Sequence, residues 1–167
     1  FLPLFGFGAA VQTLVGNNLG AKKYQLAKLY GFETVKVATI FTIILGIIFV
    51  TIPQYVLLII TNDWGIIEMA KPALRIAGVT QVFYATGVVL ANALQAAGRT
   101  VFVMTAEMVT NLLIFVPLAY FLGVVLDFGL TGAWMALPGY IIIYSVAVFL
   151  RFNSKNWNTT IPINLEN

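Results

Sequence analysis

Cysteine and histidine are both absent from this sequence. Zinc sites of the usual kind therefore lose their thiolate and imidazole ligands, and nucleophilic catalysis based on either residue loses its parts. No GxxxxGK string occurs, so the phosphate-binding loop of an ATPase is missing as well. We expect no enzyme, no metal site and no cofactor in this chain.

Charge is also scarce, since 9% of the 167 residues are charged while 60% are hydrophobic. A soluble domain usually carries about a quarter charged residues. The few basic residues form no patch with interleaved aromatic side chains, which excludes a nucleic-acid-binding protein. Because the charges are too few to cover an exterior in water, we expect a lipid bilayer around the protein.

Long uncharged stretches are what the sequence has instead. Four of them carry no charged residue, and a fifth is interrupted only by Glu107. Each reaches the roughly 20 apolar residues needed to cross a bilayer, and open strands would leave their backbone unsatisfied in lipid. The pattern predicts an all-α polytopic membrane bundle of five transmembrane helices, followed by a tail over residues 153–167. The helices are expected at about residues 1–20, 34–60, 70–98, 100–126 and 129–152.

The breaks between these stretches carry further expectations. The polar elbow AKKYQLAKLYG, residues 21–31, is expected to form a short separate helix at the membrane interface. Pro72 suits the first turn of the third helix. Gly16 and Gly20 are four residues apart and predict the close approach of another helix. The polar tail is expected to be frayed.

The placement of lysine and arginine predicts the orientation. If the elbow is cytoplasmic, alternation puts the turn before Thr100 and the carboxyl terminus on the same side. Two of the nine basic residues, Lys71 and Arg75, then lie on the opposite side. Cytoplasmic loops carry the excess of lysine and arginine, so the tail is expected to be cytoplasmic. The other seven are Lys22, Lys23, Lys28, Lys36, Arg99, Arg151 and Lys155.

The chain opens at Phe1, without an initiator methionine or a basic region before the first apolar stretch. Many transporters are built from repeats of six helices. Five helices without an internal repeat therefore suggest one lobe of a two-lobed transporter, whose amino-terminal half is missing here. We expect that half to be a partner of this one.

Three stretches resemble the multidrug and toxic compound extrusion (MATE) family. GAAVQTLVGNNLGAKKYQLA, residues 8–27, is similar to the second helix of each half in the family, and NALQAAGRT, residues 92–100, is similar to an LQGxGRT helix end. GLTGAWMA and LRFNSKNW, residues 129–136 and 150–157, resemble the last helix and its RFxSGKW-like end. Asn17 stands where glutamine is commoner, so the match is not complete.

The resemblance implies helices eight to twelve of twelve in a proton- or sodium-coupled antiporter. Such a protein exports small organic, often cationic, molecules by alternating access, here expected in the inner membrane of a bacterial or archaeal cell. In some members an acid on the helix corresponding to residues 70–98 contributes to cation binding. This chain has no acid between Arg75 and Arg99. Ion coupling would then involve the missing half or Glu107.

Glu107 is the leading candidate for ion coupling. A carboxylate inside a spanning helix is costly and usually faces a cavity or a partner. It either binds the coupling ion or pairs locally with a basic residue, since Arg99 lies eight residues away. Glu33 lies three residues before Lys36 and predicts a local ion pair at the interface. Glu68, Lys71 and Arg75, spaced by three and four residues, predict a second local group, a charged face near the outer surface.

Neutral polar side chains near membrane depth are the candidates for a substrate cavity. One face of the helix expected at 70–98 carries four of them, Gln81, Tyr84, Asn92 and Gln95. They either line a cavity or connect helices by hydrogen bonds worth about 0.6 kcal/mol each. The candidates are Gln12, Gln81, Tyr84, Asn92, Gln95 and Asn111.

Two alternatives to drug export stay open. A flippase for lipid-linked saccharides or lipids would carry a cavity rich in arginine and lysine. A non-transporting membrane scaffold would bury the polar face of residues 70–98 against a protein partner and pair Glu107 locally.

Overall fold

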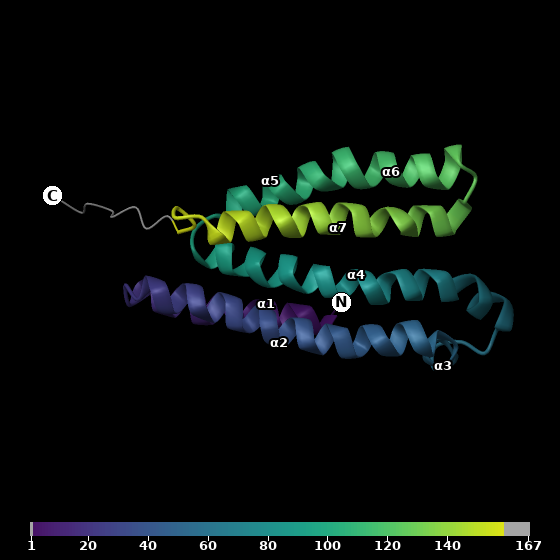
Figure 1. Ribbon diagram of the computed structural model, residues 1–167, viewed down its shortest axis with the longest axis horizontal. Helices are drawn as coiled ribbons and strands as arrows, with labels where there is room; N and C mark the ends of the chain where they lie inside the picture. The colour runs from purple at the N-terminus through teal and green to yellow at the C-terminus, as the bar shows by residue number, and fades with distance from the viewer. Residues whose placement is uncertain (1, 159–167) are drawn as a thin grey trace.

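The computed structural model describes residues 2–158, and the regular structure of this part of the chain is entirely helical (Figure 1). The all-α fold expected from the sequence is confirmed. The helices are α1 (Leu2–Gly20), α2 (Tyr24–Thr51), α3 (Pro53–Leu58), α4 (Trp64–Ala96), α5 (Thr100–Thr110), α6 (Val116–Tyr120) and α7 (Gly129–Asn153), with π-helical segments η1 (Asn111–Phe115) and η2 (Phe121–Val125) on either side of α6.

Helix α4 is the centre of the bundle. It contacts α1, α2, α3, α5 and α7, whereas α1 contacts only α2 and α4 among the elements of the described chain. In Figure 1, α2, α4 and α7 run side by side, α5 and α6 lie beyond α7, and α1 lies behind α2. The middle and end of α4 are accordingly buried, with Val89, Leu90, Ala93 and Leu94 fully inaccessible.

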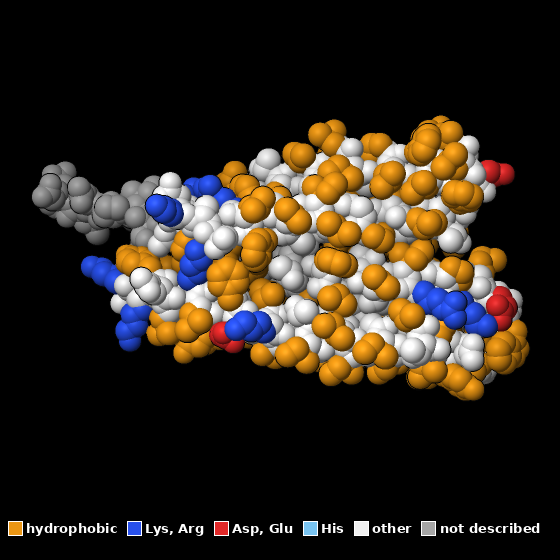
Figure 2. Space-filling view, viewed as in Figure 1, with side chains coloured by type: hydrophobic (Ala, Val, Ile, Leu, Met, Phe, Trp, Pro, Cys, Tyr) orange, Lys and Arg blue, Asp and Glu red, His pale blue; other side chains and the backbone are white. Residues whose placement is uncertain are grey.

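Four helical stretches are long and apolar enough to cross a membrane: α2, α4, residues 100–125 and α7. Figure 2 shows hydrophobic side chains spread over the middle of the molecule and most charged side chains at its two ends. This is the surface of an integral membrane protein, because lipid tails favour an apolar belt. The fifth expected span, α1, is a helix but is not among the four. Gln12, Asn17 and Asn18 reduce its apolar character.

The first connection differs from the expected elbow. Helix α2 begins at Tyr24, not at 34, and it ends at Thr51, not at 60, so residues 24–31 are not a separate helix. The chain turns at Lys22, which has a positive φ of 60°. The Lys23 amide donates to the Asn18 carbonyl at 2.8 Å. This closes α1 with a hydrogen-bond pattern that usually places glycine at the turning residue.

Helix α4 also begins earlier than expected, at Trp64 rather than at 70. The Asp63 carboxylate caps it by accepting hydrogen bonds from the amides of Gly65 at 2.8 Å and Ile66 at 3.4 Å. Aspartate is a favoured N-cap because it satisfies amides that have no partner inside the helix. Pro72 therefore lies inside α4 and not in its first turn.

The beginning of the tail is packed rather than frayed. The Trp157 ring is buried and lies 4.8 Å from the Phe152 ring, measured between centroids. The Arg99 guanidinium donates to the Asn156 carbonyl at 2.9 Å. These contacts hold the first residues after α7 against the bundle, while the rest of the expected tail, residues 159–167, lies outside the described residues.

Glycines let α4 approach its neighbours, although not the glycines expected from the sequence. A Cβ atom built on Gly46 of α2 would lie 2.6 Å from the Gly78 carbonyl oxygen of α4, so the two backbones touch. A Cβ atom on Gly16 or Gly20 of α1 meets no atom within 4 Å among the described residues, so the close approach expected there is not found in this part of the chain. Helices in lipid associate largely through this kind of close packing.

We expect Gly46→Ala to destabilise the protein by about 1–3 kcal/mol, because the added methyl group has to displace backbone atoms of α4. The measurement is thermal unfolding of the purified protein in detergent. Gly16→Ala is the matched control, since its methyl group meets no atom of residues 2–158 and alanine favours the helix. Equal losses of stability in both variants would contradict the close contact of α2 and α4.

Candidate functional site

Glu107 lies on α5 with its side chain exposed, in a shallow and open cavity of about 360 Å³ on the surface of that helix. The other lining residues are Met104, Met108, Asn111 and Leu112. They follow one another at helical spacing along α5 and η1, so a single helical face forms the cavity wall. Of the six predicted cavity residues, Asn111 is therefore beside Glu107.

Three tyrosines share the electrostatic surroundings of Glu107. Its negative charge acts on the hydroxyl groups of Tyr84 in α4 and of Tyr140 and Tyr144 in α7. Tyr144 is buried, whereas Tyr84 and Tyr140 are half-buried. The fold thus places three phenol groups, on α4 and α7, within electrostatic range of the carboxylate on α5.

Tyr140 and Tyr144 were not among the residues predicted from the sequence. They are four residues apart, which puts both on one face of α7. This spacing was a usable signal, but it does not show that the face is directed towards α4 and α5. Only the packing of the three helices brings these tyrosines near Glu107.

Glu107 has no ion-pair partner between residues 2 and 158. The ion pairs in that range are Lys36 with Glu33 and Lys71 with Glu68. The predicted pair of Glu33 with Lys36 is confirmed. Of the predicted group of Glu68, Lys71 and Arg75, the described residues show the pair of Glu68 with Lys71 and no ion pair of Arg75. The alternative in which Arg99 neutralises Glu107 is not found, because the Arg99 guanidinium is directed to the carbonyl at residue 156.

Two residues of the predicted polar face of α4 serve helix packing. Gln81 is buried, and its amide nitrogen donates to the Thr42 carbonyl of α2 at 3.4 Å. The amide nitrogen of Asn92 donates to the Val88 carbonyl at 2.9 Å and packs against Gly8 of α1. Both amides are thus engaged by the bundle itself.

The remaining candidates are more accessible. Tyr84 and Gln95 are half-buried on α4, and Gln12 is exposed on α1. Tyr84 lies within electrostatic range of Glu107, whereas Gln12 is on α1, which does not contact α5 in the described chain. Their role in lining a substrate cavity stays a prediction.

A polar contact that the sequence did not suggest joins α4 to α7. The Ser145 hydroxyl donates to the Phe83 carbonyl at 2.9 Å, and the serine is buried. Gly87 makes room for it, since a Cβ atom there would lie 2.7 Å from the serine oxygen.

Within the described residues, no group of three or more acidic, cysteine or histidine side chains is placed to hold a metal ion.

Comparisons with known proteins agree with the resemblance found in the sequence. The family model described as MatE matches residues 1–121. A probable multidrug resistance protein NorM of Thermotoga maritima is 31% identical over 159 residues, which are 94% of this chain and 34% of that protein. Protein DETOXIFICATION 30 of Arabidopsis thaliana is 25% identical over 92% of this chain and 31% of its own length.

The uncharacterized transporter YisQ of Bacillus subtilis is 25% identical over 94% of this chain and 35% of its own length. The chain thus spans about a third of the length of the curated relatives it matches. The family match covers most of the chain, including the motifs at residues 8–27 and 92–100 and the helix that carries Glu107. The chain belongs to the multidrug and toxic compound extrusion (MATE) family of membrane transporters.

Proposed function

We propose that this chain forms one lobe of an antiporter that exports small organic cations by alternating access. The observation that carries the proposal is Glu107, a carboxylate on a spanning helix with no ion pair in the described chain. Charged side chains at such positions are costly and usually serve a transport path. The names of the relatives, which include probable multidrug resistance proteins, support the same function.

The surroundings of Glu107 suit a lipophilic cation. Met104, Met108 and Leu112 offer adaptable apolar contacts, and Asn111 offers an amide. The carboxylate supplies the opposite charge. When it binds a proton or a sodium ion, its attraction for the organic cation is weakened, so binding of the two cations becomes mutually exclusive.

This exclusion couples the two fluxes in the proposed cycle. A cation-loaded site exchanges its substrate for a proton or sodium ion on the outer side, and the reverse exchange occurs on the cytoplasmic side. Rigid-body movement of one lobe against the other alternates the access. The proposed second lobe is the amino-terminal half of the same transporter, and the proposed location is the inner membrane of a bacterial or archaeal cell.

The two alternatives receive less support. A flippase for lipids or lipid-linked saccharides needs cationic side chains for a phosphate group, and the cavity beside Glu107 has none. A scaffold that pairs Glu107 locally does not agree with the absence of such a pair between residues 2 and 158. Gln81 is buried, as a scaffold would require, but its partner is α2 of the same chain.

We expect Glu107→Gln to lower the efflux of an organic cation such as ethidium, because its binding weakens by roughly tenfold to a hundredfold. A hydrogen bond to a charged group contributes about 1.5–3 kcal/mol to binding. Glutamine replaces the charged carboxylate of Glu107 with a neutral amide, so this contribution is lost. The measurement is ethidium efflux from cells expressing the full-length transporter, normalised to its amount in the membrane.

Glu33→Gln is the matched control, because Glu33 pairs with Lys36 at the exposed surface of α2. It should leave efflux unchanged. Normal efflux by Glu107→Gln would remove this carboxylate from the mechanism.

We also expect the carboxyl end of α7 to be cytoplasmic. Because the 167 residues contain no cysteine, single cysteines introduced at Asn62 and Lys155 report the two ends of the bundle. Both positions are exposed. In intact cells a membrane-impermeant maleimide should label Asn62→Cys and leave Lys155→Cys unlabelled until the cells are opened. The reverse pattern would contradict the proposed orientation.

A further inference from the structure

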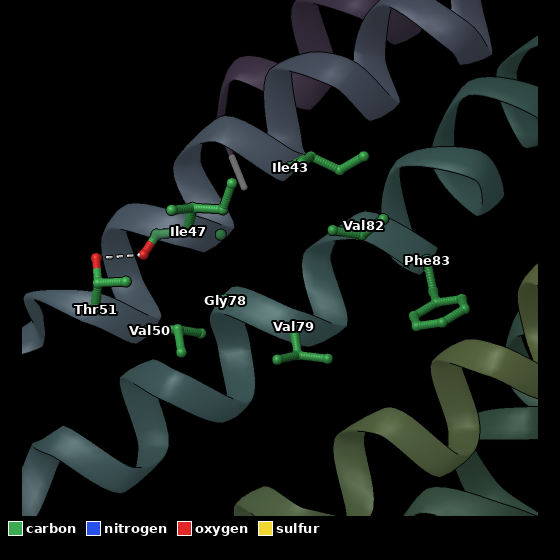
Figure 3. A pocket seen from close by; sticks show the side chains of 9 residues that line it. Ile43, Ile47, Val50, Thr51, Gly78, Val79, Val82 and Phe83 are labelled. Atoms are coloured by element: carbon green, nitrogen blue, oxygen red, sulfur yellow. Dashed lines mark hydrogen bonds between the residues drawn. The ribbon is translucent and has the colours of Figure 1, made fainter.

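An apolar groove of about 390 Å³ runs between α2 and α4 (Figure 3). The contact of Gly46 with Gly78 forms its floor, because the two helices meet there without side chains between them. Branched and aromatic side chains rise on both sides of this contact. They are Ile43, Ile47 and Val50 of α2 and Val79, Val82 and Phe83 of α4.

The side chains that line this groove are almost entirely hydrocarbon. Its one hydroxyl group, on Thr51, already donates to the Ile47 carbonyl at 2.6 Å, as the dashed line in Figure 3 marks. The groove is open to the surroundings of the bundle, since Val79 is 57% exposed and Phe83 is 46% exposed. A flexible acyl chain fits such a surface, whereas a polar ligand finds no bonding partner there.

A cation lies on the same side of α4 beyond one end of the groove. Arg75 precedes Val79 by four residues and Val82 by seven, so the three share one helical face. The groove ends near Thr51, the last residue of α2, which places Arg75 close to the membrane interface. Figure 2 shows basic side chains on this end of the molecule beside the apolar belt.

Between residues 2 and 158, Arg75 has no ion-pair partner, unlike the neighbouring Lys71. Lys71, one turn earlier, is neutralised by Glu68. The Arg75 side chain is exposed and makes no hydrogen bond or ion pair within the described residues. A guanidinium group binds phosphate through several N–H donors, so it is suited to an anionic headgroup.

We propose that the α2–α4 groove is a binding site for an anionic phospholipid. One acyl chain lies between the rows of side chains on α2 and α4, and the headgroup phosphate pairs with Arg75. The groove is formed by α2 and α4, whereas the cavity beside Glu107 is lined by α5 and η1 alone, so the lipid site does not depend on the proposed drug export. The charge at one end and the hydrocarbon lining along the rest match the two parts of this lipid.

The test is native mass spectrometry of the delipidated full-length protein with palmitoyl-oleoyl phosphatidylglycerol and the phosphatidylcholine of the same chains. We expect phosphatidylglycerol to bind about fivefold more tightly, the effect of one basic residue near an anionic lipid. Arg75→Gln should remove this preference. Val79→Trp should fill the groove and reduce the binding of both lipids.

Lys155→Gln and Leu113→Trp are the matched controls, because both residues are exposed and neither lines the groove. They should leave lipid binding unchanged. Equal affinity of the two lipids for the unmodified protein would overturn the proposal, as would retention of the preference in Arg75→Gln. A change of oligomeric mass in Val79→Trp without loss of lipid would assign the groove to a protein partner and also overturn it.

Discussion

Close packing around α4 is the constraint on which the rest of the structure depends. In lipid, apolar side chains gain little by leaving one hydrocarbon surface for another, so helices associate through tight contact and internal hydrogen bonds. Gly8, Gly46, Gly78 and Gly87 provide that contact, since a Cβ atom at each would lie within 3 Å of a neighbouring helix. The contacts of α4 with its neighbouring helices therefore hold the bundle together.

The same packing decides which polar groups remain available. Gln81 is directed to a backbone carbonyl of α2, and Ser145 of α7 donates to a carbonyl of α4. Such groups are satisfied inside the bundle and add to its cohesion. Glu107 lies on the less enclosed α5, where no basic side chain of the described chain neutralises it. Its charge is then available to a ligand, which is the basis of the proposed export mechanism.

Local features were the most predictable from the sequence. The ion pairs of Glu33 with Lys36 and of Glu68 with Lys71 follow from a spacing of three residues on a helix. The last helix was expected at 129–152 and is found at Gly129–Asn153, because charge and glycine mark its two ends. The start of α2 was missed, since a polar composition at residues 24–31 was mistaken for a separate element, although a helix can continue through it.

The sequence by itself determined the class of the protein: its uncharged stretches require a helical membrane bundle, and its motifs indicate the MATE family. Tertiary structure alone decided which residues meet. Tyr140 and Tyr144 lie within electrostatic range of Glu107, and among the described residues Gly46 rather than Gly16 contacts another helix. The physical reason is that periodicity assigns a residue to a face of its own helix. It does not say which neighbouring helix, or whether lipid, covers that face.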